Sequence, residues 1–134
     1  MNDIQYVNTE SLSNPRGHYS YAVCANGFVF ISGLVPTRPD GSKMSGEPFI
    51  AQAEQVLRNL DEVLRSCAST PSRLLHVRVY LSAIENWAAF NNLYATWIGD
   101  VRPARCIVPV PELHYGLALE IEAVAMQNTT SNLA

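Results

Sequence analysis

The sequence contains little charge for a small protein. Lysine, arginine, aspartate and glutamate make up 16% of its 134 residues, whereas an average soluble domain has roughly 25%. A small domain also has proportionally more surface to keep in water than a large one. The apolar residues, 48% of the chain, must therefore form an exposed patch or be covered by another chain. We expect the second arrangement, a homo-oligomer.

Several classes of protein are disfavoured by what the chain lacks. No run approaches about 18 consecutive apolar residues, so no segment is predicted to span a membrane. No basic stretch followed by an apolar run begins the sequence, which predicts a cytoplasmic location. The formal net charge of −3 argues against a protein that neutralises the phosphates of a nucleic acid.

Disulfide, metal and nucleotide sites are not indicated either. The three cysteines are widely spaced and form no CxxC pair, which predicts reduced thiols. His18, His76 and His114 lack the spacing of metal ligands. The chain contains no GxGxxG motif and no P-loop. The sequence therefore predicts a protein with no metal ion and no organic cofactor.

A hairpin and a helix are predicted in the first half of the chain. Two β-rich runs, 19–25 and 28–32, flank Asn26-Gly27, the strongest short signal for a hairpin. Apolar residues from Ile50 onward recur at spacings of three, four and seven. This spacing predicts one buried face of a helix over 49–66.

A strand and a second helix are predicted next. Apolar and polar residues alternate from Leu75, which predicts a half-buried strand over 75–81. Ser82, with Glu85 three residues later, forms a capping-box pattern at the start of a helix. That helix is expected to end at about Ile98, just before a glycine.

The order of the elements predicts the fold class. Two last strands, over 105–110 and 118–125, follow the second helix. Two helices cannot cover both faces of a five- or six-stranded sheet, so an α+β fold with both helices on one face is expected. Subunit association would cover the other face. Residues 1–126 are predicted to form a single domain, and 127–134 a polar, disordered tail.

Charged residues in the last two strands are the candidates for chemistry. Arg105 begins one apolar strand, and Glu120 and Glu122 point to the same face of the other because strand side chains alternate. A charge in an apolar strand is costly unless it is paired or lies at a water-filled site. Two interpretations stay open: ion pairing or solubility at a sheet edge, or a carboxylate-binding arginine with a carboxylate base.

The order and spacing of short motifs resemble the RidA (YjgF-like) family of enamine and imine deaminases. The likeness extends over nearly the whole chain, from about Asn8 to Ala125. The motifs are Gly17-His18-Tyr19-Ser20, Phe30-Ile31-Ser32-Gly33, Gln52, Asn59-Leu60, Val79-Tyr80-Leu81, Asn91, Tyr94, Arg102-Pro103-Ala104-Arg105 and Glu120-Ile121-Glu122-Ala123. The proline-alanine-arginine segment and the last strand are the most specific of them.

The resemblance implies a fold, an assembly and an activity. The fold would be chorismate-mutase-like, a mixed six-stranded sheet with two helices on one face. Three copies would form a homotrimer with a barrel-like centre and with sites in the clefts between subunits. The activity would be hydrolysis of reactive 2-imino and enamino acids to 2-keto acids and ammonia. The protein would thus be a hydrolase of C–N bonds whose partners are this small molecule and its own copies.

The resemblance also implies roles for individual residues. Arg105 would bind the substrate carboxylate, because a guanidinium is a planar fork that matches it. Glu120 would accept a proton from the attacking water, and Tyr19 would relay a proton to the departing nitrogen. Further pocket positions that would bind substrate are Ser32, Gly33, Asn91, Ile107 through its backbone N–H, and His114.

Several positions depart from the family pattern. The departures are His18 for proline, Tyr21 for glutamine, Leu34 for glutamine, Ile107 for cysteine, and His114 within a segment that lacks the usual leucine-proline. We expect these changes to lie near the pocket and to favour substrates larger than two- or three-carbon imino acids. His114 or Tyr115 would then line the cleft, although both could equally fill a turn.

Two other functions stay open. A dedicated catabolic deaminase would act on a larger substrate, such as an aminomuconate-type intermediate, with the same residues. A non-enzymatic small-molecule-binding or chaperone-like trimer would bind its ligand at Arg105 without turnover. Ribonuclease activity, which is sometimes attributed to relatives, is disfavoured by the acidic charge balance.

Overall fold

The computed structural model describes residues 3–129, and a six-stranded sheet with two α-helices dominates them. The strands are β1 (Gln5–Val7), β2 (Ala22–Ala25), β3 (Phe28–Leu34), β4 (Leu74–Leu81), β5 (Ala104–Pro109) and β6 (Leu119–Met126). The helices are α1 (Phe49–Ser66) and α2 (Trp87–Ile98), accompanied by the short 3-10 turns η1 (Pro71–Arg73), η2 (Ile84–Asn86) and η3 (His114–Gly116). Neither α-helix is long and apolar enough to cross a membrane.

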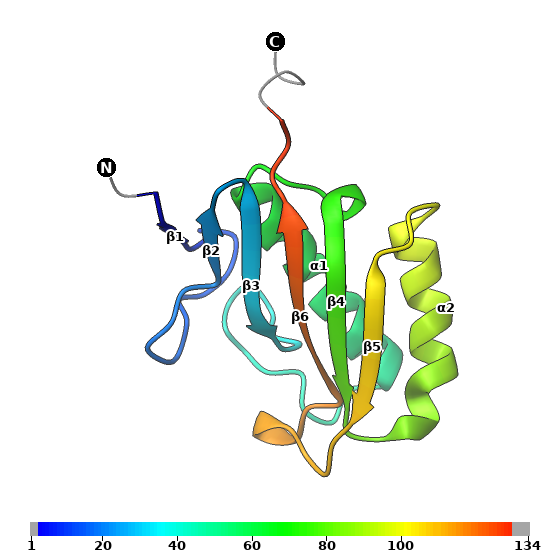
Figure 1. Ribbon diagram of the computed structural model, residues 1–134. Helices are drawn as coiled ribbons and strands as arrows, with labels where there is room; N and C mark the ends of the chain where they lie inside the picture. The colour runs from blue at the N-terminus through cyan, green and yellow to red at the C-terminus, as the bar shows by residue number, and fades with distance from the viewer. Residues whose placement is uncertain (1–2, 130–134) are drawn as a thin grey trace.

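The sheet is mixed, as predicted. Its strand order is β1-β2-β3-β6-β4-β5, and every neighbouring pair is antiparallel except β4 and β5. The parallel pair is joined through α2, because parallel strands need a long crossover. α1 lies behind the sheet and α2 beside β5, so the helices leave the opposite face of the sheet uncovered (Figure 1). The predicted α+β fold is therefore confirmed.

The predicted hairpin is also confirmed. Ala25 pairs with Phe28, so the turn between β2 and β3 contains only Asn26 and Gly27. Their φ angles of 53° and 81° fit a type I′ turn, which requires positive φ at both central positions. β2 begins at Ala22 rather than at Tyr19, because the Tyr21 backbone N–H donates to the Asn8 side chain instead of pairing with another strand. β1 was not predicted, since three residues carry too little pattern.

Alternation along β6 separates the core from the open face. Leu119, Ile121 and Ala123 are buried against the helices, which contribute fully buried residues such as Leu60 and Phe90. The intervening β6 side chains point to the other side, because successive strand residues face opposite ways. Each buried leucine or phenylalanine contributes roughly 1.5–3 kcal/mol to folding, so this layer holds the sheet to its helices.

Buried amide side chains of α1 hold the loop that follows β3. The Asn59 side-chain N–H₂ donates to the carbonyls of Val35, at 3.3 Å, and Thr37, at 2.9 Å. Its oxygen accepts a hydrogen bond from the Gln55 amide at 2.9 Å. Asn59 thereby satisfies two partly buried backbone carbonyls, and buried carbonyls left unpaired are costly.

Gln52 holds the segment that leads into β6 in a similar way. Its N–H₂ donates to the Glu47 carbonyl, and its oxygen accepts from the Ala118 backbone N–H, both at 2.9 Å. One helix therefore anchors the end of β3 and the beginning of β6. The hydrophobic periodicity gave no reason to expect polar residues on the buried face of α1.

Three local predictions were wrong. Ile50, placed on the buried helix face, is 43% exposed in the first turn of α1. Leu75, placed in the core, is 41% exposed because an irregularity between Leu74 and His76 in the pairing with β6 gives the inward position to Leu74. Ser82 does not cap a helix: its backbone N–H and hydroxyl both donate to the Ala118 carbonyl. η2 follows, and α2 begins only at Trp87.

The first residues of the predicted tail are bound to the body of the protein. The Gln127 backbone N–H donates to the Gly27 carbonyl, and the Asn128 N–H donates to the Ala68 carbonyl, both at 2.8 Å. Arg73 donates to the Gln127 carbonyl at 3.1 Å. The rest of the predicted tail, 130–134, lies outside the described residues.

The uncovered face of the sheet carries a row of apolar side chains. Tyr6, Val23, Phe30 and Val124 occupy paired positions on β1, β2, β3 and β6. Tyr6 is 70% exposed and Phe30 49%, although aromatic side chains gain most when they are buried. We call these four residues the apolar row. The predicted excess of apolar surface thus lies on the face that the helices leave bare.

Replacing Asn59 by alanine is expected to destabilise the protein by about 1–3 kcal/mol, because two loop carbonyls lose their buried donor. Denaturant unfolding at one fixed protein concentration measures the change. Glu54→Ala, an exposed position on the same helix, is the control and should shift stability by no more than about 0.5 kcal/mol. Equal effects of the two substitutions would show that the Asn59 hydrogen bonds contribute nothing.

Candidate functional site

A depression on the uncovered side of the sheet contains several predicted site residues. It encloses about 350 Å³, and its lining residues are Tyr19, Ser32, Gly33, Val35, His114 and Glu120. They come from the segment before β2, from β3 and its following loop, from η3 and from β6. We call this hollow the Glu120 depression. It brings together five of the predicted positions.

Gly33 makes room for the Glu120 carboxylate. β3 and β6 lose regular register between Ile31 and Leu34, which places Gly33 directly against the glutamate side chain. A methyl group added at Gly33 would overlap the carboxylate oxygen. A glycine here therefore serves the close approach of a functional side chain rather than a turn.

Glu120 is half-buried at the Glu120 depression. Within residues 3–129 it accepts no side-chain hydrogen bond and forms no ion pair. Burial raises the pKa of this carboxyl above its ordinary value, and the nearby charge of Glu122 adds to the rise, whereas His114 opposes it. A carboxyl with a raised pKa exchanges protons closer to neutral pH, as a general base or acid requires.

Glu122, two residues along the same face, is instead engaged in a structural pair. The Tyr80 hydroxyl donates to its carboxylate, and an Arg78 nitrogen lies 4.0 Å from it. The bond to Glu122 raises the pKa of Tyr80 to about 12. The two interpretations of charge in this strand therefore apply to different residues: Glu122 is paired, and Glu120 has no such partner among residues 3–129.

Hydroxyl groups of Ser32 and Tyr19 also line the Glu120 depression. The Ser32 hydroxyl donates to the Ser20 carbonyl at 2.6 Å, so its oxygen remains able to accept a hydrogen bond from a ligand. Tyr19 is exposed, and with His18 and Tyr6 it also lines the adjoining hollow. The departure at His18 thus lies beside the candidate site, as predicted.

His114 is held at the Glu120 depression by the strained turn η3. Tyr115 has a φ of 61°, a conformation that is unfavourable for a bulky residue. The Ser45 hydroxyl donates to its carbonyl at 2.6 Å, and the Lys43 ammonium lies 4.7 Å from its ring centre. The His114 ring stacks on it at 4.9 Å between ring centres. His114 lines the Glu120 depression together with Glu120, whereas Tyr115 does not.

Arg105 lies in a second hollow, between α2 and β5. This α2–β5 pocket encloses about 400 Å³ and includes Asn91, Tyr94, Arg102 and Arg105. The Arg105 guanidinium lies 5.0 Å from the Tyr94 ring centre and 5.8 Å from that of Trp87. Cation–π contacts with the two rings hold the guanidinium in place without neutralising it.

The two hollows lie on opposite sides of the sheet. Arg105 pairs in register with Val77, which is fully buried under the helices. Glu120 pairs with Tyr80, on the uncovered face. A single chain therefore does not bring Arg105 and Glu120 together, and a shared cleft between subunits stays a prediction. Ile107 shares the side of Arg105, and its side chain packs against the core.

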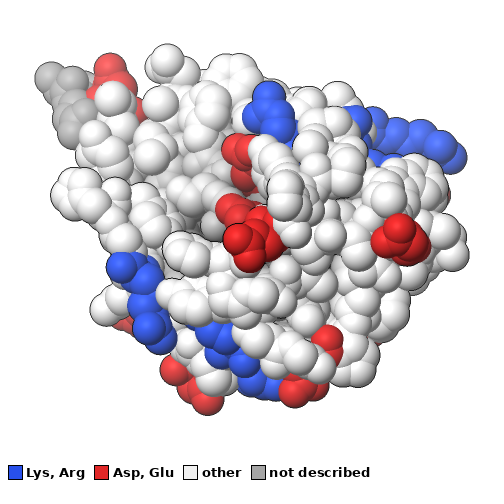
Figure 2. All heavy atoms as spheres, turned by 90° about the horizontal axis from the view of Figure 1, so that it is seen from below, with Lys and Arg blue, Asp and Glu red and all other residues white. Residues whose placement is uncertain are grey.

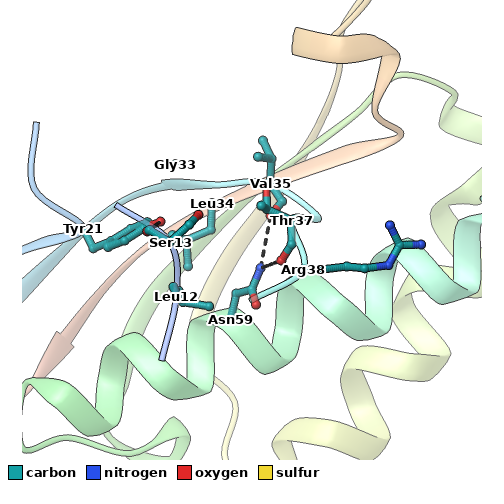
Figure 3. A pocket seen from close by; sticks show the side chains of 9 residues that line it. All are labelled: Leu12, Ser13, Tyr21, Gly33, Leu34, Val35, Thr37, Arg38 and Asn59. Carbon is teal, nitrogen blue, oxygen red and sulfur yellow. Dashed lines mark hydrogen bonds between the residues drawn. The ribbon is translucent and has the colours of Figure 1, made fainter. Parts of the chain in front are cut away.

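Two departures from the family pattern do not line the Glu120 depression itself. Tyr21 and Leu34 line a small cavity of about 30 Å³ between β3 and α1 (Figure 3). The Tyr21 hydroxyl donates to the Ser13 carbonyl at 2.5 Å, and Leu34 is buried. In Figure 3, Asn59 reaches up from α1 to Val35 and Thr37 beside them. This cavity shares Gly33 and Val35 with the Glu120 depression, so the expectation that the two changes affect substrate choice stays a prediction.

Charge is sparse around the end of the molecule where β5 connects to β6. Figure 2 looks at this end and shows acidic side chains gathered near its middle, beside a hollow, with basic ones mostly nearer the edges. Most of the visible surface carries no charge. Among residues 3–129, no group of three or more His, Cys, Asp and Glu is placed to hold a metal ion.

Sequence reasoning gave no role to Arg102 and no site role to Tyr94. Both line the α2–β5 pocket with Arg105. The sequence contained a signal for Arg102, since it stands three residues before Arg105 at the same end of a strand. Tyr94 was quoted only as a motif residue, and its position against Arg105 depends on how α2 packs.

Comparison with known proteins gives consistent matches. A family profile described as Endoribonuclease L-PSP, the YjgF/RidA family, matches residues 9–127. The chain is 35% identical over 118 residues to Protein HMF1 of Saccharomyces cerevisiae, covering 88% of this chain and 91% of that protein. It is 31% identical over 121 residues to Reactive Intermediate Deaminase A, chloroplastic, of Arabidopsis thaliana, covering 90% of this chain and 65% of that protein.

Solved structures agree with the fold. The crystal structure of RidA from the Antarctic bacterium Psychrobacter sp. PAMC 21119 superposes with a TM-score of 0.86 at 29% identity, covering 91% of this chain and 98% of that one. Other relatives have names that place them in mitochondria or chloroplasts. The cytoplasmic location therefore stays a prediction.

Gly33→Ala is expected to cost about 1–3 kcal/mol of stability, because the new methyl group overlaps the Glu120 carboxylate. The cost should be much smaller when Glu120 is already alanine, since the overlapping atoms are then absent. Unfolding of the wild type, both single variants and the double variant gives this coupling. The same cost in both backgrounds would contradict the close approach of Gly33 to Glu120.

Proposed function

This chain belongs to the Endoribonuclease L-PSP (YjgF/RidA) family, and we propose that it is a hydrolytic deaminase of reactive 2-imino and enamino acids. The observation that carries the proposal is the unpaired, half-buried carboxylate of Glu120, with its raised pKa, in a hollow lined by hydroxyl and imidazole groups. A relative is named Reactive Intermediate Deaminase A, which supports the same reaction class.

Arg105 binds the substrate carboxylate in this proposal. Its guanidinium forms no ion pair within residues 3–129, so its donors are free for a ligand. The rings of Tyr94 and Trp87 fix its position, and a fixed planar fork suits bidentate binding of a carboxylate. Asn91, in the same pocket, and the backbone N–H of Ile107 would add neutral donors.

Glu120 activates the water. Its carboxylate accepts a proton from the water as the oxygen attacks the imine carbon, which gives a carbinolamine. The proton then passes to the nitrogen, directly or through Tyr19 or His114, both of which line the Glu120 depression. The carbinolamine hydroxyl then gives its proton to the carboxylate as the carbonyl forms, the C–N bond breaks, ammonia leaves and a keto acid remains. One water is consumed, and no electrons are transferred.

The positions of these groups favour a site built from more than one chain. Arg105 and Glu120 lie on opposite sides of one sheet, so the same substrate would meet Arg105 of one copy and Glu120 of another. The apolar row provides surface for that association. We propose a homotrimer in which three uncovered sheet faces pack together and three sites form between neighbouring copies.

Arg105→Ala and Glu120→Gln are expected to impair different kinetic constants. Arg105→Ala should lower kcat/KM for 2-iminobutanoate by about two orders of magnitude or more, because the carboxylate loses its charged partner. Glu120→Gln should lower kcat by about 10²-fold to 10⁴-fold with a smaller effect on KM. In the wild type, kcat should fall on acidification, beginning above the pKa of an ordinary glutamate. Imines generated by an amino-acid oxidase, with ammonia release as the readout, provide the assay.

The same assay separates the competing functions. Wild-type-like constants in the Arg105→Ala protein would remove Arg105 from the site, and an unchanged kcat in Glu120→Gln would remove Glu120 from the chemistry. Binding of a keto acid at Arg105 without any acceleration of imine hydrolysis would contradict the enzymatic proposal and support a binding protein.

Phe30→Glu is expected to convert the trimer into monomers, because it places a charge in the centre of the apolar row. Sedimentation or light scattering measures the mass, and circular dichroism verifies that the variant is folded. Ile50→Glu is the matched control, since Ile50 is similarly exposed but lies on α1, away from the uncovered face. A wild-type monomer, or dissociation by both substitutions, would refute the proposed assembly.

A further inference from the structure

We propose that the α2–β5 pocket binds a second anionic group of the substrate through Arg102, so that imino acids with two carboxylates are the preferred substrate class. This inference rests on the proposed function and assigns a specificity to the same site. It follows from three features of the pocket: an excess of positive charge, a buried hydroxyl group without a partner among residues 3–129, and apolar residues in the lining.

The pocket carries two positive charges and no negative one. Arg102 and Arg105 both line it, and no acidic residue does. Among residues 3–129, the ion pairs involve other arginines, namely Arg38, Arg65 and Arg78. Asp100 precedes Arg102 in the same loop, but it does not line the pocket or pair with either guanidinium. Like charges gathered in one hollow repel each other, and an anion relieves the repulsion.

Tyr94 supplies an independent indication that a ligand binds here. Only 6% of this residue is exposed, and its hydroxyl has no hydrogen-bond partner among the described residues. Burial raises the pKa of Tyr94, so the hydroxyl stays protonated and remains a donor. A buried donor without an acceptor is rare and costly. Tyr94 lines the α2–β5 pocket, and because its hydroxyl is covered, a ligand oxygen would reach it only after a small shift of the ring or of its cover.

The two guanidinium groups differ in how they are held, and this difference divides their roles. Arg105 is half-buried against two aromatic rings, which suits the carboxylate next to the reacting carbon. Arg102 is exposed in the loop before β5 and can adjust to the far end of a ligand. Ile98, Val101 and Pro103 line the same pocket and provide apolar surface for the methylene groups between two carboxylates.

The consequence is a preference rather than an absolute requirement. A substrate with one carboxylate would use Arg105 and leave Arg102 in water. A substrate with two would gain a further charge-assisted interaction, which favours it by about tenfold or more. A lysine at position 102 would keep the charge but lose the fork geometry.

Matched pairs of substrates test the inference. An amino-acid oxidase acting on L-aspartate and 2-aminobutyrate, or on L-glutamate and norvaline, supplies imines that differ by one carboxylate at equal chain length. We expect the wild type to have the higher kcat/KM for at least one dicarboxylic member of these pairs. Arg102→Gln should lower the ratio of dicarboxylic to monocarboxylic kcat/KM about tenfold, and Arg102→Lys should restore part of it.

A control variant and a binding measurement complete the test. Arg65→Gln, which removes an exposed arginine from α1, is the control and should leave the ratio unchanged. Calorimetry with 2-oxoglutarate and 2-oxopentanoate measures the same preference without turnover, and Arg102→Gln should reduce it. If the wild type hydrolyses monocarboxylic imines but neither ratio responds to Arg102→Gln, the inference fails and the proposed function stands. If no imine is hydrolysed faster than in buffer, the proposed function fails.

Discussion

The alternation of side chains across the sheet is the constraint on which the site depends. A strand residue faces either the helices or the uncovered side, and strand register carries that choice to its neighbours. Arg105 shares a side with the buried Val77, whereas Glu120 shares a side with Tyr80. The guanidinium and the carboxylate are therefore separated by the sheet itself. An active site that uses both groups is therefore more readily built from two chains than from one.

Several features prepare each half of that site within the single chain. Gly33 leaves space for the Glu120 carboxylate, and the α1 amides Gln52 and Asn59 tie down the segments on either side of it. These polar groups lie where periodicity predicts only apolar ones. Their burial is tolerated because each is hydrogen-bonded to backbone groups that would otherwise be unsatisfied. The backbone on either side of the Glu120 carboxylate is thus held by hydrogen bonds that also stabilise the fold.

Sequence patterns correctly predicted features that depend on residues close together in the chain. They failed for features that depend on pairing between distant segments. The Asn26-Gly27 turn and the shared face of Glu120 and Glu122 follow from local rules, and both are present. Leu75 lost its core position to an irregularity in the pairing with β6, and Ser82 was drawn from capping to the Ala118 carbonyl. The placement of Arg105 and Glu120 on different sides could not be predicted, because it depends on register between strands.

The scarcity of charge acquires a structural meaning from this arrangement. In a chain with few charged residues, an ionised group that is only half exposed and has no partner is conspicuous, and the two hollows contain Glu120 on one side of the sheet and Arg105 on the other. An unpaired carboxylate and an unpaired guanidinium would neutralise each other if they met directly. Within each chain, the sheet keeps the Arg105 guanidinium and the Glu120 carboxylate apart. Between chains, a bound substrate would lie between the two groups, with its own carboxylate at Arg105 and its imine at Glu120. Arg105 and Glu120 are therefore the two charges that a small ligand would pair, if that ligand carried a carboxylate at one end and an imine nitrogen at the other.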